Sequence, residues 1–459
     1  MKRPAVAVFL LAQALYFATA SGWPWRSPDE YEVYFQTESL VEHGTLAIPQ
    51  LKGREKELFF GKPGRDGQLY APYGPFVAYC AAPFYLLARL VTASQGDERA
   101  GLTTLAAATA GALAVAGFFR AARRRTNEKD ALLLSLALAL SVLWPYSKSF
   151  FSEAFSAAAL VWAWVLLEEE RVPWAALLLG AACLLKATNV FFALPLALAR
   201  KERAVLLLGV VAAGLVHMQW NSHRFEDWKD FGYNWKEKIP RGEPRPFGGS
   251  PLRGLAVLLA SPGKSIFVWA PCLLVAIPHL KKERAIATVG LAGLAIFSVY
   301  MYPEGGYCHG PRHVVPIVPL LLLPAAHGYA RRVLVPLAIA GALMNGLAAS
   351  TSYLEDQALG TDTAHPREVY YTIDETVPEG LPQNVYRLGY LPQLSLPETL
   401  AASPGTPGTG LDLFCHHATG WVRFLPLGLA LVSLALGLVT LRTPLLSREN
   451  AAILPARDP

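Results

Sequence analysis

Of the 459 residues, 53% are hydrophobic and only 17% are charged, whereas soluble domains carry about 25% charged residues. The apolar residues fall in long runs, which indicates an all-α, polytopic integral membrane protein and excludes a soluble enzyme. The formal net charge is +6, but the basic residues form short clusters between apolar runs, where they set topology and meet anionic lipid headgroups. Membrane lipids are therefore expected partners, and nucleic acid is not.

The first apolar run covers residues 4–20 and follows Lys2 and Arg3. Its basic start and Ala-rich end also fit a cleaved signal peptide. We interpret it as an uncleaved anchor, because cleavage would detach the next loop from the helix that positions it.

Two adjacent carboxylates, Asp29 and Glu30, follow this run in the loop that starts at residue 21. Together with Tyr31 and Tyr34 they supply a proton acceptor and interfacial aromatic rings, as an acid/base site beside lipid needs. The same acidic pair directly after Pro28 also favours an ordinary helix N-terminus. The residues alone leave both interpretations open.

Further apolar runs long enough to cross a membrane follow along the chain. They cover residues 101–119, 131–146, 153–168, 203–220, 265–280, 285–301, 313–328, 333–350 and 421–441. Residues 174–199 are too long for one span and contain the polar segment 186–189, so we expect two short helices that meet at a polar apex. This predicts about 12 spans.

The segment 73–93 decides the topology. If it crosses the membrane, the basic residues 123–125 lie on the same side as the acidic loop. If it is a juxtamembrane or re-entrant helix, the basic clusters gather on the side of Lys2 and Arg3, as the positive-inside rule favours. We therefore predict juxtamembrane helices in the first external loop, 21–100, and cytoplasmic termini.

Three external stretches carry further candidate residues. Asp66 and Tyr70 lie in a Gly- and Pro-punctuated segment that is either an ordered interfacial loop or a connector. Glu153 is at the start of an apolar span. It is either a helix cap or a second acidic member of the site. Arg224 and Tyr233 lie in a polar and aromatic stretch that is suited to hold a sugar or to form a solvated interfacial helix.

A late external segment, GGYCHGPRHVVPIVP, places His309 and Arg312 at a helix entrance. An arginine there can clamp a phosphate with two parallel hydrogen bonds, and Lys264 lies where a lipid phosphate would sit or simply snorkels. A divalent metal is conceivable but not indicated, because His309 and His313 lack a third ligand at a useful spacing. No cofactor is implied. Cys308 and Cys415 lie in predicted external loops and could pair, although nothing in the sequence brings them together.

In order, these motifs resemble the GT-C superfamily of polyprenyl-phosphate-sugar-dependent glycosyltransferases. The motifs are the acidic first loop, DGQLYAPYGP, SE at a span start, NSHRF followed by FGY, SPGKSIFVWAP and the late Gly-His-Pro-Arg segment. The chain is similar in particular to the branch of protein O-mannosyltransferases and the lipid A aminoarabinose transferase, over about residues 4–328. Residues 351–420 and the last span with its tail, 421–459, fall outside this resemblance.

The resemblance implies a GT-C-like transmembrane catalytic domain over residues 1–350, with its active site on the external face. It implies Asp29 as the catalytic base with Glu30 beside it, Glu153 as a second acidic residue and Arg312 as a phosphate contact helped by Lys264 or Arg224. The implied reaction moves a sugar from a lipid-linked donor to a glycan, lipid or protein acceptor with inversion, at the periplasmic face of a bacterial inner membrane. A flippase of polyprenyl-linked lipids and a non-catalytic scaffold are the alternatives; transporters tend to show internal repeats, and none is evident.

Overall fold

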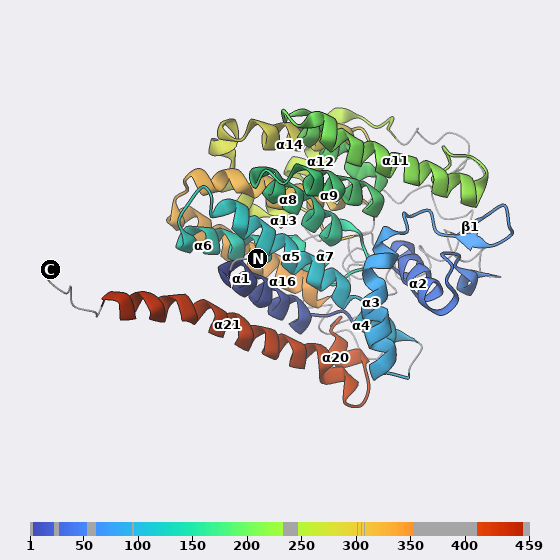
Figure 1. Cartoon of the computed structure of the whole chain (residues 1–459), viewed down its shortest axis with the longest axis horizontal. Helices are drawn as coiled ribbons and strands as arrows, with labels where there is room; N and C mark the ends of the chain where they lie inside the picture. The colour runs from blue at the N-terminus through green and yellow to red at the C-terminus, as the bar shows by residue number, and fades with distance from the viewer. Residues whose placement is uncertain are drawn as a thin grey trace.

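The computed structural model describes residues 3–22, 27–52, 61–93, 96–232, 247–300, 302–303, 305–306, 308–351 and 411–452. This part of the chain is helical apart from one small hairpin, in which β1 (Lys62–Pro63) pairs antiparallel with β2 (Leu69–Tyr70). Figure 1 shows the helices gathered in one bundle, with the last helix lying along one side. The predicted helical class is therefore confirmed.

The first half of the bundle contains α1 (Arg3–Ala18), α2 (Pro28–His43), η1 (Pro49–Leu51), α3 (Phe76–Val91), α4 (Asp97–Thr103), α5 (Leu105–Ala122), α6 (Glu128–Ala139), α7 (Leu143–Tyr146), α8 (Glu153–Glu168), α9 (Val172–Leu185), η2 (Ala187–Asn189), α10 (Val190–Leu198) and α11 (Arg203–Phe225). The second half contains α12 (Pro251–Ala260), α13 (Ile266–Trp269), η4 (Pro271–Val275), η5 (Ile277–Lys282), α14 (Arg284–Ser298), η6 (Arg312–Ile317), α15 (Val318–Leu322), η7 (Leu323–His327), α16 (Arg331–Ser350), α20 (Phe414–His417), η9 (Val422–Phe424) and α21 (Leu425–Ala452).

Four helical stretches in the described chain are long and apolar enough to cross a membrane: Asp97–Ala122, Arg203–Phe225, Arg331–Ser350 and Val422–Leu441. The count of about 12 spans is not confirmed. Prolines shorten several of the expected runs, since a proline removes a helical hydrogen bond and clashes with the preceding turn. The run 265–280 is divided into α13, η4 and η5, and the run 313–328 into η6, α15 and η7. The predicted break near Lys186 is confirmed, because α9 ends there and α10 begins after η2.

Small residues let the central helices approach closely, as in other membrane bundles. A Cβ added to Gly180 of α9 would lie 2.6 Å from the carbonyl oxygen of Gly209, and one added to Gly209 of α11 would lie 2.1 Å from that of Ala176. The backbones of α9 and α11 are therefore in direct contact. Asn345 of α16 also ties the broken helices together by donating hydrogen bonds to the carbonyl oxygens of Trp269 and Leu140.

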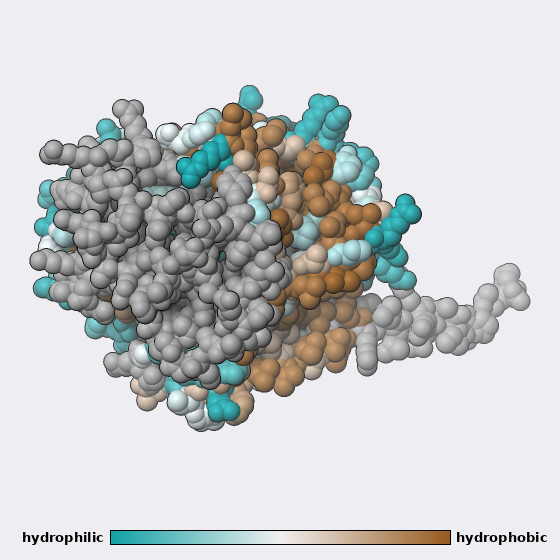
Figure 2. All heavy atoms as spheres, turned by 180° about the vertical axis from the view of Figure 1, so that it is seen from behind, coloured by the Kyte–Doolittle hydropathy of each residue, from teal (hydrophilic) through white to brown (hydrophobic). Residues whose placement is uncertain are grey.

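Large apolar side chains cover outward faces of the bundle. Leu208 of α11, Leu343 of α16 and Val439 of α21 are 67%, 62% and 63% exposed. Figure 2 shows a broad apolar area on one face of the molecule. Monomeric soluble proteins seldom expose such extended apolar patches, so these faces are suited to contact lipid.

The hairpin, α2 and α3 lie together at one end of the bundle (Figure 1). Tyr34 of α2 packs against Tyr85 of α3 with 5.9 Å between ring centroids, and the Tyr85 hydroxyl donates a hydrogen bond to Glu42 at 3.0 Å. With 16 residues and Pro83 in its interior, α3 is shorter than the roughly 20 residues that span a bilayer. The juxtamembrane position of α3 stays a prediction.

Candidate active site

Four charged side chains from four separate elements meet at the end of the bundle that carries α2. Arg312 Nη2 lies 2.5 Å from Asp29 Oδ1, and Arg312 Nε lies 3.2 Å from Glu153 Oε1. The same Glu153 oxygen accepts a hydrogen bond from Lys186 Nζ at 2.6 Å. We call Asp29, Glu153, Lys186 and Arg312 the charged cluster.

The members of the charged cluster differ in their exposure. The side chain of Glu153 is 0% exposed, whereas those of Asp29 and Arg312 are 18% and 14% exposed. A buried carboxylate requires ionic and hydrogen-bonding partners to offset its desolvation, and Glu153 has two cations. Asp29 is thus the more accessible carboxylate of the cluster.

Local sequence explains why these residues converge. Asp29 follows Pro28 in the first turn of α2, and Glu153 is the first residue of α8. Each carboxylate therefore lies at the positive end of a helix dipole. Lys186 has an extended backbone (φ −154°, ψ 118°) between α9 and η2, so its side chain leaves the helical path. The sequence left two interpretations of Asp29 open, a helix N-terminus and a site residue. In the structure Asp29 lies at the start of α2 and also contacts Arg312.

Neighbouring residues hold Arg312 and the loop before it. The ring centroid of Phe151 lies 4.2 Å from Arg312 Cζ. Lys264 is 1% exposed and donates hydrogen bonds to the carbonyl oxygens of Gly306 at 3.0 Å and Cys308 at 2.5 Å. The carbonyl oxygen of His309 accepts a hydrogen bond from the Tyr146 hydroxyl at 2.8 Å. Lys264 and His309 thus fix the loop that presents Arg312.

The remaining predicted residues of α2 are buried beside the charged cluster. Glu30 is 0% exposed and accepts a hydrogen bond from the Phe150 backbone N–H at 3.4 Å. Tyr31 and Tyr34 are 5% and 1% exposed. Both rings pack on Phe35, with centroids 6.2 Å and 5.8 Å away. Glu30, Tyr31 and Tyr34 therefore pack in the interior behind Asp29 and do not form an open surface.

Asp66, Tyr70 and Arg224 form a second cluster, which joins the hairpin to the end of α11. Tyr70 donates a hydrogen bond to Asp66 at 2.9 Å, and its ring meets that of Phe225 edge-on at 6.3 Å. Arg224 donates hydrogen bonds to the Ala71 carbonyl oxygen and, at 2.8 Å, to Asn221 Oδ1. Burial and the bond to Asp66 raise the pKa of Tyr70 to about 12, so its hydroxyl stays protonated at neutral pH. Tyr233 lies outside the described residues.

Lys186 is the member of the charged cluster that sequence reasoning did not include in the site. The signal was present, because a lysine within an apolar run of a membrane protein is costly unless it pairs with another group. Its partner Glu153 is 33 residues away in the sequence, so only the packing of α8 against α9 reveals the pair.

Among the described residues, no group of three His, Cys, Asp or Glu side chains is arranged to hold a metal ion. All five cysteines are free thiols. The residues of the charged cluster themselves offer a carboxylate beside a guanidinium and an ammonium group.

The chain belongs to glycosyltransferase family 87, whose sequence model matches residues 70–304. It is a membrane glycosyltransferase of the GT-C superfamily, as the resemblance of its motifs predicted. No curated protein sequence matches the chain.

The chain is similar to several solved structures, among them the following three. ArnT from Cupriavidus metallidurans in the apo state is 14% identical, with a TM-score of 0.47, and the match covers 93% of this chain and 75% of ArnT. The apo oligosaccharyltransferase of Archaeoglobus fulgidus is 12% identical, with a TM-score of 0.32 and coverage of 100% and 53%. AglB of the same organism, in complex with an inhibitory peptide and a dolichol-phosphate, is 14% identical, with a TM-score of 0.33 and coverage of 99% and 52%.

Proposed function

We propose that the protein transfers a sugar from a polyprenyl-phosphate-linked donor to a hydroxyl of a glycan, lipid or protein acceptor at the external face of the membrane. The observation that carries the proposal is the contact between the partly exposed carboxylate of Asp29 and the guanidinium of Arg312. This pair supports the proposal because a carboxylate can accept a proton and a guanidinium can bind a phosphate, in a chain that belongs to a glycosyltransferase family.

Asp29 accepts the proton of the acceptor hydroxyl while that oxygen attacks the anomeric carbon. The bond between the anomeric carbon and the phosphate oxygen breaks, and the electron pair leaves with the polyprenyl phosphate. A lipid phosphate is a good leaving group, so no separate general acid is needed. A single displacement with one base inverts the anomeric centre, unlike the double displacement of retaining enzymes.

Arg312 stabilises the departing phosphate. Its bonds to Asp29 and Glu153 occupy Nη2 and Nε, and a guanidinium has five N–H donors, so donors are left for phosphate oxygens. Glu153 is a positioning residue in this mechanism, because it is buried and holds both Arg312 and Lys186. Preorganised donors of this kind lower the barrier by stabilising charge as it develops.

The test is transfer of radiolabelled sugar from polyprenyl-phosphate donors to a membrane extract by the purified protein. Asp29→Asn keeps the shape and removes the proton acceptor, so turnover should fall by about a hundred- to ten-thousand-fold. Glu30→Gln is the matched control and should cost less, because Glu30 is fully buried against the Phe150 backbone. Full activity of Asp29→Asn with normal membrane insertion would refute Asp29 as the base.

A further inference from the structure

A basic cavity lies at the end of the bundle away from the charged cluster. It has a volume of about 580 Å³ and is lined by Arg124, Arg125, Trp164, Glu168, Arg200, Lys282, Glu283, Arg284, Ala285 and His327. The helix α8 has Glu153 at its start and Glu168 at its end, and 16 residues at 1.5 Å each separate the two ends by about 24 Å. The cavity is thus a separate site from the proposed catalytic cluster.

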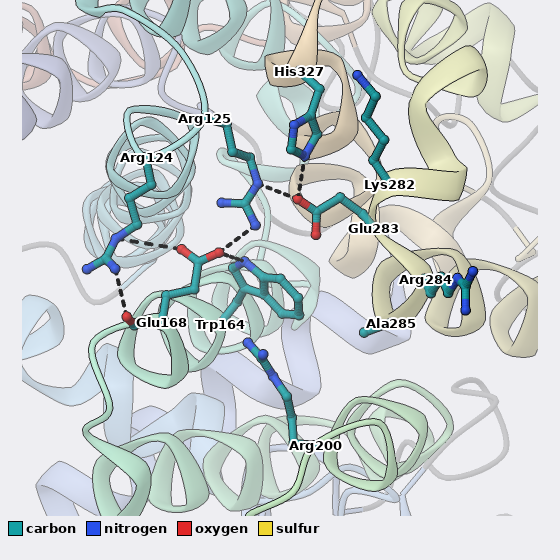
Figure 3. Close-up of a pocket in the computed structure, with 10 residues that line it drawn as sticks. All are labelled: Arg124, Arg125, Trp164, Glu168, Arg200, Lys282, Glu283, Arg284, Ala285 and His327. Atoms are coloured by element: carbon teal, nitrogen blue, oxygen red, sulfur yellow. Dashed lines mark hydrogen bonds and ion pairs between the residues drawn. The ribbon is translucent and has the colours of Figure 1, made fainter.

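The two carboxylates of the cavity are already occupied by neighbours. Glu168 lies 2.5 Å from Arg125 Nη2 and accepts a hydrogen bond from Trp164 Nε1 at 2.8 Å. Glu283 lies 2.5 Å from Arg125 Nε and 2.8 Å from His327 Nε2. Figure 3 shows these bonds drawn across the cavity. These bonds hold the side chains of Arg125, Trp164 and His327 in the lining of the cavity. They do not neutralise the cations of the lining that lack such a carboxylate.

Three cations of the lining remain without a carboxylate. In the part of the chain that the structure describes, no acidic side chain lies within ion-pair distance of Arg200, Lys282 or Arg284. Clustered cations repel one another at close range. The cavity therefore carries an excess of positive charge that an anion would balance.

Arg200 is the sharpest indication of a ligand. Its guanidinium stacks on the Trp164 ring at 4.6 Å, and Figure 3 shows it reaching from its helix end toward that ring. Its Nε and Nη2 atoms are buried and find no hydrogen-bond acceptor among the described residues. Buried donors without acceptors are costly and rare, and the planar fork of an arginine matches the oxygens of a phosphate.

We propose that this cavity binds a phosphate group, supplied by an anionic lipid headgroup or by a soluble phosphate. The basic clusters that form it are those that the positive-inside rule places in the cytoplasm, at the level of lipid phosphates. Leu198, two residues before Arg200 in the chain, is 51% exposed, which gives the cavity an apolar flank beside lipid. This site does not depend on the proposed transfer reaction.

The experiment measures thermal unfolding of the purified full-length protein in neutral detergent. One arm adds dioleoylphosphatidylglycerol in mixed micelles, and a second adds inorganic phosphate against sodium chloride at matched ionic strength. We expect a saturable rise of the unfolding temperature in the lipid arm, the phosphate arm or both. A response to lipid alone identifies a headgroup as the source, and a response to inorganic phosphate shows that the phosphate group suffices.

Arg200→Gln should weaken the apparent affinity about ten-fold or more, since it removes a charged donor pair. Arg284→Gln, at an exposed lining residue, should weaken it without disturbing packing. The matched control is Lys201→Gln, because Lys201 is adjacent to Arg200, 91% exposed and outside the cavity. No saturable response, or an equal response in Arg200→Gln, Arg284→Gln and Lys201→Gln, would overturn the proposal.

Discussion

Arg312 is the residue on which the charged cluster depends, because one guanidinium contacts carboxylates from two helices. Asp29 belongs to α2 and Glu153 to α8, and Arg312 bonds to them through different nitrogen atoms. A planar fork can do this, whereas the single ammonium group of a lysine cannot reproduce the geometry. Shape as well as charge is therefore required at position 312.

Substitution of Arg312 tests this requirement. We expect Arg312→Lys to raise the KM for the lipid-linked donor and Arg312→Ala to raise it further and lower turnover, since a phosphate loses its clamp. Arg312→Ala should also destabilise the fold by about 3 kcal/mol, because Glu153 stays buried with one partner fewer. Donor titrations with both variants, alongside thermal unfolding, make the comparison. Unchanged donor affinity in both variants would move the phosphate contact away from Arg312.

At the scale of elements, a buried ion pair joins the turn before α8 to the segment before α20. Lys148 Nζ lies 3.0 Å from Asp412 Oδ2, and the two side chains are 1% and 3% exposed. Asp412 also accepts hydrogen bonds from the Ser21 hydroxyl at 3.0 Å and the Gly22 backbone N–H at 3.0 Å. Three distant segments thereby meet next to the helix that carries Glu153.

Removal of one partner of this pair should be worse than removal of both. Asp412→Ala leaves the Lys148 charge buried, so we expect a loss of about 3 to 5 kcal/mol, and the double variant Lys148→Met with Asp412→Leu should lose less. Ser21→Ala is a control that removes one hydrogen bond and should cost about 1 kcal/mol. Unfolding midpoints in detergent measure all three. A double variant less stable than Asp412→Ala would contradict this account.

Glu283 connects three elements at the opposite end of the bundle. It precedes α14, bonds to Arg125 after α5 and accepts a bond from His327 at the end of η7. Burial acts to raise the pKa of Glu283, but the hydrogen bonds from Arg125 and His327 outweigh it and lower this pKa below the ordinary value. The ionised form is therefore bound more tightly in the folded protein.

This lowered pKa sets the sign of a pH dependence. The stabilisation is complete above the unfolded pKa of about 4.3 and is lost as the pH falls through the lower, folded pKa. Glu283→Gln should cost about 1 to 2 kcal/mol at pH 7, and the difference between the two proteins should narrow below about pH 4.3. Unfolding midpoints from pH 7 to pH 3.5 give the comparison. A difference that widens on acidification would show that another group controls it.

At the scale of the whole molecule, charge is divided between the two ends of the bundle. In the charged cluster the two carboxylates, Asp29 and Glu153, are matched by two cations, Lys186 and Arg312. The other end of the bundle carries the basic cavity. The positive-inside rule predicts that the basic end lies in the cytoplasm. The proposed outward orientation of the charged cluster rests on this prediction.

Topology reporters test this orientation. A reporter inserted after Arg125 should be cytoplasmic, and one inserted after Gly249 should be external, because the basic residues 123–125 resist translocation. Accessibility of each reporter to an impermeant label in intact cells is the measurement. External labelling after Arg125 would mean that residues 73–93 cross the membrane and that the predicted orientation is reversed there.

The sequence by itself determined the features that depend on local chemistry. Long apolar runs predict membrane helices. Residues 174–199 are too long for one span and contain the polar segment 186–189, which predicts the break between α9 and α10, because a charged side chain is costly in a lipid-facing helix. Pro28 with its acidic neighbours predicts the start of α2. The order of the motifs also indicated the GT-C superfamily, which the family match confirms.

Only the tertiary structure decided which residues share a site, because contacts across long sequence separations leave no local pattern. It joined Arg312 to Asp29, 283 residues away, and Lys186 to Glu153. The structure also shows that Arg224 binds the backbone next to the hairpin. From its charge alone, Arg224 suited a phosphate contact equally well. The tertiary structure further showed that prolines divide the runs 265–280 and 313–328 into short segments, since hydropathy measures the preference for lipid and not the continuity of backbone hydrogen bonds.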